Sequence, residues 1–308
     1  MKILKLSNLN KHSLTQINRR VLEHENLTYH KLKKVADDLL MDFSNFYELN
    51  ASHFNNLELD DYYINSKPLR NAWSNQQNDA SLENSLDFAF ELIEKNKPDV
   101  IFDHARVFKS RVQEVKKRYP YVRQISSWDG YSLTKADGSM GYDYYFTCVQ
   151  SIVDAYERNG IKAYLNPFGF EKSILSKISQ PKVLKNKISF LGSVVNPAHA
   201  DRREYIKSLM KEDLIDLYVG NLGTGLVTRS KLRELLRMDF RELLANWQLE
   251  QRNLGGKYGK EMYECLTKYT ATLNVHGSNV FQLGNMRLTE ASGVGVCQLI
   301  DYKKGAEQ

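Results

Sequence analysis

Short apolar runs alternate along the chain with longer stretches in which apolar residues recur every three to four positions. The short runs predict β-strands, and the longer stretches predict helices with one face packed on a sheet. Such alternation is typical of strand–helix–strand units and a mostly parallel sheet. In the first half it predicts strands over residues 2–6, 99–103, 122–126, 142–147 and 163–165, and helices over 82–95, over 107–118 and through Tyr156.

The alternation continues in the second half of the chain. It predicts a strand over 188–193, a helix over 201–211 and a strand over 214–219. The segment between the halves is rich in lysine and serine, has a weak apolar pattern and contains Pro181, which is typical of a linker. We therefore expect two α/β domains, over residues 1–172 and 188–308, joined by a linker over 173–187.

A long segment between Gly220 and Gly259 also has apolar residues at helical spacing. These residues are Leu232, Leu235, Leu236, Phe240, Leu243, Leu244 and Trp247. The pattern predicts a helix packed on the sheet with a solvated opposite face. Because arginines and lysines are interspersed with it, an amphipathic helix on a membrane surface is the alternative, although nearby acids dilute its charge.

Length and composition indicate a soluble protein of two ordinary domains, with 308 residues and a hydrophobic fraction of 42%. No apolar run reaches the ~18 to 20 residues that a membrane span needs, and residues 1–6 lack the longer apolar segment of a signal peptide. We expect a cytoplasmic protein, with a peripheral position at the inner membrane face as the alternative. The oligomeric state is not indicated.

The net charge of +6 and the pI near 8.9 are compatible with binding to an anionic small molecule or to an acidic membrane surface. They are equally compatible with a charge that only keeps the protein soluble. Lysines and arginines are spread among acids rather than gathered in a stripe, which disfavours nucleic acid as a partner. The three cysteines, Cys148, Cys265 and Cys297, are isolated in or beside apolar runs. They predict reduced core residues and no metal site.

The stretch from Leu273 to Asp301 is the most informative. An apolar strand leads into a glycine and asparagine turn, then a short helix, a glycine break and a second apolar strand. We expect Asn285 to cap the helix, leaving other amides and the positive dipole end for a diphosphate. Arg287 and Glu290 share one helix face, where they would hold a phosphate and the ribose hydroxyls. An ordinary ion pair between them is the alternative.

Other polar residues are expected at strand ends, where open α/β sheets bind ligands. Gly192 and Ser193 would let a backbone amide approach a phosphate or sugar, and His276 would hydrogen-bond a sugar or phosphate oxygen. In the first half, His104 and Asp129 are candidate general bases for an acceptor hydroxyl. Each of these residues also fits a purely structural role at a turn or strand end.

Several common motifs are absent from the chain. It contains no Gly-x-Gly-x-x-Gly fingerprint, no Gly-x-x-x-x-Gly-Lys-Ser/Thr loop and no Gly-x-Ser-x-Gly elbow. The absence of these motifs disfavours three functions for this chain, which are dinucleotide-dependent dehydrogenase, P-loop ATPase and hydrolase.

The second half resembles the spore-maturation-type glycosyltransferases, which are bacterial enzymes of GT-B fold. The resemblance rests on Phe190-Leu-Gly-Ser193, Arg202 or Arg203, Tyr258-Gly-Lys-Glu-Met262, Leu273-Asn-Val-His276 and the Asn285-Met-Arg-Leu-Thr-Glu290-Ala-Ser-Gly-Val-Gly run. It covers residues 188–301 and is only topological over residues 1–170. It implies two Rossmann-like domains facing across a cleft, with the acceptor on the first domain and the nucleotide sugar on the second.

The resemblance also implies an activity, which is transfer of a sugar from a nucleoside diphosphate sugar to an acceptor hydroxyl. No bound cofactor or metal is implied. Glu290 would take the ribose hydroxyls, with Asn285 and Arg287 near the diphosphate. Many GT-B enzymes carry a second Glu eight residues earlier, where this chain has Gln282. The family normally continues through further helices after residue 305, so we expect a second domain truncated at its C-terminus.

Surface polysaccharide or other glycan biosynthesis is the expected setting, with glycan, lipid-linked, protein or small-molecule acceptors all open. The donor base, the sugar and a retaining or inverting outcome are also open. The alternatives are a nucleotide-sugar epimerase of the same fold and a non-catalytic module that binds nucleotide sugar. Nucleic-acid binding has only the modest positive charge in its favour.

Overall fold

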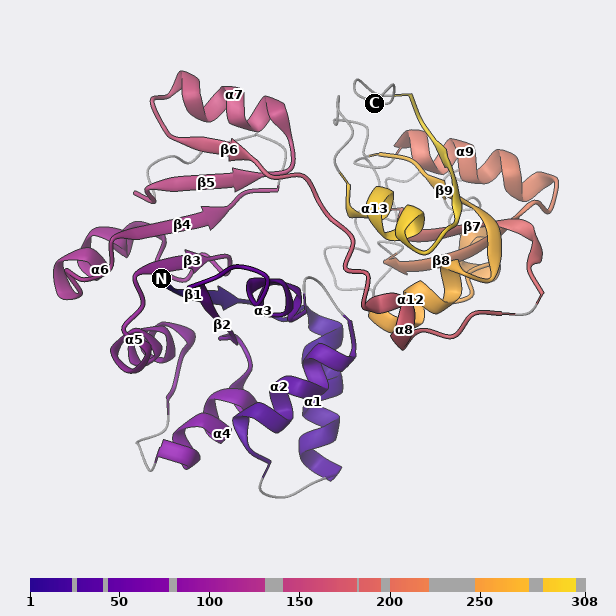
Figure 1. The fold of residues 1–308 in the computed structure, drawn as a ribbon. Coiled ribbons are helices and arrows are strands. Elements are labelled where there is room, and N and C mark those ends of the chain that lie inside the picture. The colour runs from indigo at the N-terminus through magenta and orange to yellow at the C-terminus, as the bar shows by residue number, and fades with distance from the viewer. Residues whose placement is uncertain are drawn as a thin grey trace, which may run out of the picture. The chain divides into compact units, whose positions relative to one another are not determined.

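The computed structural model describes residues 1–23, 27–40, 44–77, 82–130, 141–181, 183–194, 200–221, 247–276 and 285–302. The chain forms two compact units, Met1–Pro167 and Phe168–Gln308, each with its own parallel sheet (Figure 1). The division precedes the segment 173–187 in which we expect a linker. That segment contains a short helix, α8 (Ile174–Lys177), and the start of strand β7 (Lys185–Ser193).

The sheet of the first unit has six described strands in the order β2-β1-β3-β4-β5-β6, and every neighbouring pair is parallel. The strands are β1 (Lys2–Ser7), β2 (Glu58–Tyr63), β3 (Val100–Asp103), β4 (Gln124–Trp128), β5 (Tyr144–Thr147) and β6 (Ala163–Leu165). Leu4 and Leu6 are buried on one face of β1, while Lys5 is buried on the other. Burial on both faces is typical of parallel sheets.

Helices connect these strands. They are α1 (Lys11–Glu23), α2 (Tyr29–Asp38), α3 (Phe46–Ala51), α4 (Lys67–Gln77), α5 (Ser85–Asn96), the 3-10 turn η1 (Lys109–Arg111), α6 (Val112–Arg118) and α7 (Gln150–Arg158). Asn84 caps α5 by accepting from the amides of Leu86 and Asp87. The predicted apolar face of this helix is buried in the core, which confirms the helix expected over 82–95 apart from its first turn.

The helix expected over 107–118 begins later than predicted. The carboxylate of Asp103 accepts from the backbone amides of Val107 and Phe108, at 3.0 and 2.9 Å, and holds the chain in a turn there. A 3-10 turn, η1, follows before α6 begins at Val112. The competing side-chain acceptor therefore shortens the helix.

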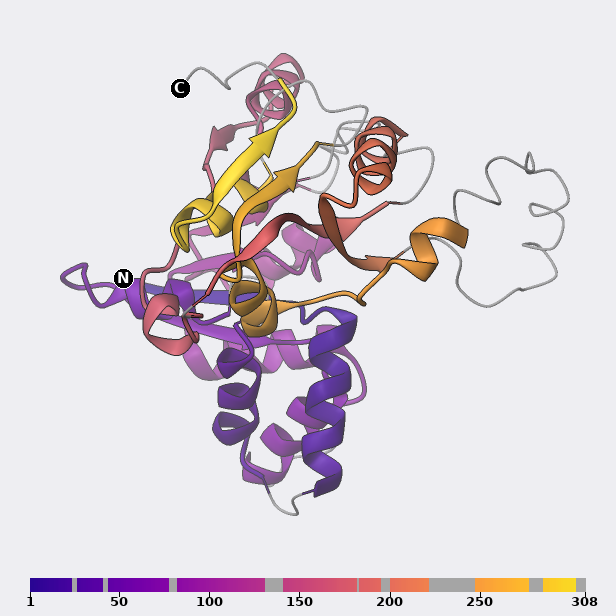
Figure 2. The same cartoon turned by 90° about the vertical axis from the view of Figure 1, so that its right-hand side faces the viewer.

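The sheet of the second unit has the order β10-β9-β7-β8, again with parallel neighbours (Figure 2). Its other strands are β8 (Ile215–Asn221), β9 (Tyr269–Asn274) and β10 (Cys297–Ile300), and its helices besides α8 are α9 (Ala200–Lys211), α12 (Gly259–Leu266) and α13 (Met286–Gly293). The strands and helices expected around 188–219 and 273–301 are confirmed. Most of the helix expected between Gly220 and Gly259 lies outside the described residues.

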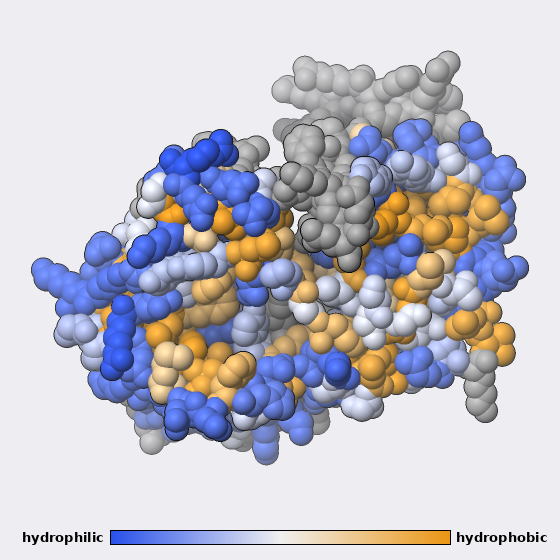
Figure 3. Space-filling view, turned by 45° about the horizontal axis from the view of Figure 1, so that its top comes forward, coloured by the Kyte–Doolittle hydropathy of each residue, from blue (hydrophilic) through white to orange (hydrophobic). Residues whose placement is uncertain are grey.

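Exposed apolar side chains occur in both units, for example Tyr164 and Trp247. On the face in Figure 3, hydrophobic residues form separate patches among hydrophilic ones. Among the helices of the described ranges, none combines the length and apolar character needed to cross a bilayer.

Candidate functional site

The parallel strands of the second unit end at one edge of its sheet, where open α/β sheets bind ligands. Arg202 of α9 joins two of these ends. Its Nη1 donates to the carbonyl of Ser193, at 2.6 Å, and its Nε and Nη2 donate to the carbonyl of Val275, at 2.9 and 2.5 Å. Burial lowers the pKa of Arg202 to about 10, with Arg287 adding to the effect and Asp301 opposing it. Arg202 therefore fixes the strand ends and lies near the charges of the candidate site.

Gly192 and Ser193 end β7 at a register shift in its pairing with β8. A Cβ at Gly192 would lie 3.2 Å from the ring of Phe190, which favours glycine there. The carbonyl of Ser193 is occupied by Arg202. A structural reason for glycine at position 192 is thus present, and the contact of either residue with a ligand stays a prediction.

His276 lies two residues after the end of β9 (Tyr269–Asn274) and is 3% exposed. Asp301, which follows the neighbouring strand β10, accepts from the backbone amide of His276 at 2.9 Å and lies 2.8 Å from its Nδ1, all through Oδ1. The Nε2 atom of His276 is buried and has no hydrogen-bond partner among the described residues. The prediction that His276 lies at the strand end is confirmed, while its ligand stays a prediction.

Asn285 caps α13, as predicted, because its side chain accepts from the amide of Leu288 at 3.2 Å. Its Nδ2 donates to Asn274 Oδ1 at 2.8 Å, and Asn274 Nδ2 donates to Gln298 Oε1 at 3.0 Å. Gln298 in turn donates to the carbonyl of Leu288 at 2.7 Å. This side-chain network fastens the start of α13 to β9 and β10. The turn before Asn285, including Gln282 and Gly284, lies outside the described residues.

Arg287 and Glu290 form the ion pair that was the alternative interpretation of their spacing. Arg287 Nη1 lies 2.9 Å from Glu290 Oε2, and the two side chains are 18% and 14% exposed. Arg287 also contacts Met262 of α12. Burial raises the pKa of Tyr263, with Glu290 adding to the shift and Arg287 opposing it. The pair is thus partly buried beside α12, and its contact with a ligand stays a prediction.

The candidate bases of the first unit both lie near Arg106. Asp129 Oδ1 is 3.1 Å from Arg106 Nη2, and Asp129 Oδ2 accepts from the hydroxyl of Tyr156 at 2.5 Å. Burial lowers the pKa of His104 to about 3, and the charges of Lys5 and Arg106 add to the shift. His104 is therefore neutral but weakly basic, and Asp129 has structural partners. Their roles as general bases stay predictions.

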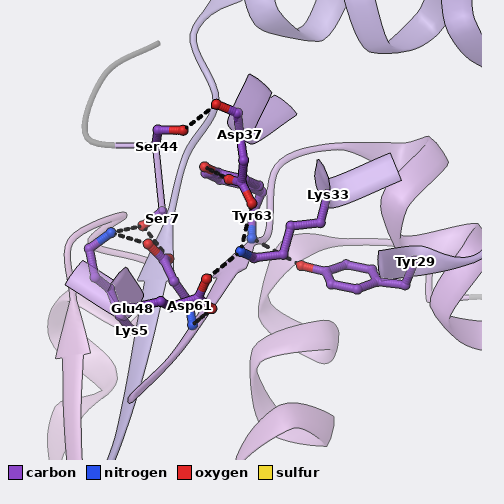
Figure 4. A network of polar contacts seen from close by, with 9 residues as sticks. All are labelled: Lys5, Ser7, Tyr29, Lys33, Asp37, Ser44, Glu48, Asp61 and Tyr63. Carbon is purple, nitrogen blue, oxygen red and sulfur yellow. Dashed lines mark hydrogen bonds and ion pairs between the residues drawn. The ribbon is translucent and has the colours of Figure 1, made fainter. Parts of the chain in front are cut away.

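A buried network of charges lies between β1, β2, α2 and α3 of the first unit (Figure 4). Lys5 pairs with Asp61 and donates to Ser7 Oγ at 2.8 Å. Lys33 donates to Asp37 at 3.0 Å and to Glu48 at 2.7 Å, and Tyr63 donates to Asp37 at 2.7 Å. The sequence pattern gave no sign of this network, because charged residues inside strands and helices are normally solvent-facing.

Two other residues of the second unit were not among the predicted site residues. Asp301 holds His276, and Arg202 fixes the strand ends. The position of Asp301 directly after an apolar strand was the available signal, since a parallel neighbour places it beside His276. The described residues contain no group of three or more His, Cys, Asp or Glu side chains suited to a metal ion.

No family model matches the chain, and no curated protein sequence matches it. Solved structures are similar to it. HepE of Anabaena, in complex with UDP and glucose, is 12% identical with a TM-score of 0.51, over 100% of this chain and 82% of that chain. The lipopolysaccharide outer core galactosyltransferase WaaB, in its apo form, is 15% identical with a TM-score of 0.47, over 100% of this chain and 82% of that chain.

A UDP-N-acetylglucosamine 2-epimerase is 10% identical with a TM-score of 0.48, over 100% of this chain and 81% of that chain. At such identities, similarity establishes the fold alone. None of these comparisons identifies the spore-maturation-type family, which stays a prediction. The chain has the GT-B fold of glycosyltransferases, with mixed α/β structure and parallel sheets.

Proposed function

We propose that this protein transfers a sugar from a nucleoside diphosphate sugar to an acceptor hydroxyl, without a bound metal. The observation that supports this most is the composition of one sheet edge in the second unit. There α13 carries its capped start and the Arg287–Glu290 pair, and the buried His276 lies just beyond the end of β9, the strand to which Asn285 is hydrogen-bonded through Asn274. These groups suit the three parts of such a donor, which are a diphosphate, a ribose and a sugar.

The chemistry follows from charge. Departure of the nucleoside diphosphate leaves negative charge on its terminal phosphate. The guanidinium of Arg287 and the amides at the start of α13 would stabilise that charge where it develops. Glu290, released from Arg287, would accept hydrogen bonds from ribose hydroxyls. Because fixed cations and amides carry the charge, this arrangement needs no metal ion.

UDP and its sugars are the first ligands to test, since HepE, which is similar in fold, is in complex with UDP and glucose. The first experiment is a thermal-shift screen of UDP, GDP, TDP and CDP and their common sugars. It uses the wild type, Glu290→Ala and, as a control, Glu212→Gln at an exposed position. A ligand present at ~100 times its dissociation constant raises the free energy of unfolding of the protein by ~2.7 kcal/mol. We expect one nucleotide class to raise the Tm of the wild type and the control but not of Glu290→Ala.

The nucleotide sugar that binds is then incubated with and without glycan or lipid-linked acceptors. The products are separated by chromatography and identified by mass spectrometry and NMR, which distinguishes epimers of equal mass. A glycosylated acceptor supports the proposal. A changed sugar without acceptor indicates an epimerase, and binding without turnover indicates a non-catalytic module. No shift with any nucleotide, on a folded sample, would overturn the donor site.

A further inference from the structure

The Nε2 atom of His276 is an unusual polar atom in the second unit. The side chain is almost fully buried, yet Nε2 has no hydrogen-bond partner within the part of the chain that the structure describes. A buried polar atom without a partner is energetically unfavourable. Its persistence at the ligand-binding edge of an α/β sheet therefore indicates that a ligand supplies the partner.

Asp301 determines which kind of partner fits. Its Oδ1 lies 2.8 Å from His276 Nδ1 and also accepts from the His276 backbone amide, so both the position and the rotation of the ring are fixed. A carboxylate has only acceptor atoms, so the proton between the two groups belongs to Nδ1. In the neutral ring, Nε2 then carries a lone pair and accepts a hydrogen bond.

Charged side chains of both signs lie at this end of the sheet. Arg202 from α9 and Arg287 from α13 are balanced by Asp301 after β10 and by Glu290 of α13. Asp301 and Arg287 also act on the pKa of Arg202, which places these charges close together.

We infer that His276 accepts a hydrogen bond from a hydroxyl group of the donor substrate, and that Asp301 is the positioning residue that sets its tautomer. The inference rests on the proposed function, because it assigns a role within the same site. A phosphate oxygen does not fit Nε2, since two acceptors would then face each other. The hydroxyl belongs to the ribose or to the transferred sugar.

The tautomer is tested on the ligand-free protein by ¹⁵N NMR of its imidazole groups. The His276 signals are identified by their loss in His276→Gln, with exposed His53→Gln as the control. We expect a protonated Nδ1 and an unprotonated Nε2 in the wild type, and a changed tautomer in Asp301→Asn. A protonated Nε2 in the neutral ring would overturn the inference whatever the protein binds.

The ligand contact is tested by calorimetric titration with the nucleotide sugar from the thermal-shift screen. Loss of one hydrogen bond in His276→Leu should weaken binding about tenfold. His276→Gln, whose amide oxygen can accept near the Nε2 position, should bind within about threefold of the wild type. Equal binding by the wild type and His276→Leu, with both folded, would overturn the inference and leave the proposed function standing.

Failure of the wild type to bind any nucleotide or nucleotide sugar would overturn this inference together with the proposed function.

The two hydroxyl sources are distinguished with UDP, 2′-deoxy-UDP and UDP-glucose, or the equivalents for another base. If the ribose is the source, His276→Leu weakens UDP and UDP-glucose alike. If the transferred sugar is the source, His276→Leu binds UDP normally and weakens only UDP-glucose. Either result supports the inference.

Discussion

Arg287 and Glu290 neutralise each other across 2.9 Å on one face of α13. Their spacing of three residues predicted a shared face, which both a nucleotide site and an ordinary ion pair require. The pair is formed and partly buried against α12. In the proposed function, a nucleoside diphosphate would replace that ion pair by one contact to phosphate and another to ribose.

Arg287→Met should weaken nucleoside diphosphate binding by about 10- to 100-fold, since hydrogen bonds to charged groups contribute about 1.5–3 kcal/mol. It should affect the uncharged nucleoside much less. Glu290→Gln should weaken both ligands to a similar extent, because in the proposed site Glu290 would contact the ribose that they share. Calorimetric titration of UDP and uridine against each variant measures the difference. Equal losses for both ligands in Arg287→Met would contradict the phosphate assignment.

Chelation should leave the transfer rate unchanged. In the proposed chemistry, Arg287 and the first amides of α13 stabilise the leaving diphosphate, so no divalent cation is needed. Initial rates are measured after dialysis against EDTA, with and without added Mg²⁺ or Mn²⁺. Loss of activity that either ion restores would overturn the metal-independent mechanism and leave the donor site intact.

Gly293→Ala should destabilise the second unit by about 1–3 kcal/mol, the usual cost of overpacking. An added Cβ would lie 2.2 Å from ring carbons of Phe170, so the end of α13 or the ring must move. Urea unfolding measures the change. Gly169→Ala is the matched control, because nothing lies within 4 Å of its added Cβ. If the contact causes the loss, Phe170→Leu should restore much of the stability of Gly293→Ala.

Lys33→Met should destabilise the first unit by about 3–5 kcal/mol, because it leaves the buried carboxylate of Asp37 and the partly buried carboxylate of Glu48 without their cation. Asp37→Asn should lower the free energy of unfolding by less than Lys33→Met does. The network has three carboxylates (Asp37, Glu48 and Asp61) against two lysines (Lys5 and Lys33), so it tolerates the loss of one negative charge, and the new amide oxygen can still accept from Tyr63. Urea unfolding at pH 7 ranks the two variants, and the reverse order would contradict the charge argument.

The same network predicts a pH dependence. Burial raises the pKa of Asp37 and Glu48 above 3.8 and 4.5, while Lys33 opposes the shift. The contribution of these two carboxyl groups to the free energy of unfolding is therefore fully present at pH values below their ordinary pKa values. It is lost as the pH rises through their raised pKa values in the folded protein. Lys33→Met removes the opposing charge, so the variant should gain more stability than the wild type when the pH is lowered from about 7 to about 5. An equal gain would argue against the network as its source.

His104→Gln should flatten the acid dependence of stability. Burial lowers the pKa of His104 from 6.5 to about 3, with Lys5 and Arg106 adding to the effect. Its contribution is present above 6.5 and is lost as pH falls toward about 3. Unfolding free energies at several pH values between 6.5 and 4 should therefore fall less steeply in His104→Gln than in the wild type. Exposed His53→Gln should keep the slope of the wild type.

Much of the fold could be predicted from local patterns. The apolar periodicity located α5, β3, β5, β6 and most of the second unit's sheet, because the faces of these elements differ regularly in burial. Strand β2 was not predicted, since its sequence contains Asp60 and the buried Asp61. Only a cation from another strand, Lys5, makes burial of Asp61 tolerable.

The sequence by itself determined two α/β units with mostly parallel sheets, the cap at Asn285 and the shared face of Arg287 and Glu290. These features depend on residues a few positions apart, so spacing encodes them. The tertiary structure alone decided that Arg202 binds the carbonyl of Val275, 73 positions away, and that Asp301 holds His276, 25 positions away. Such contacts arise only when parallel strands bring distant segments to one edge, and no local pattern records which residues meet there.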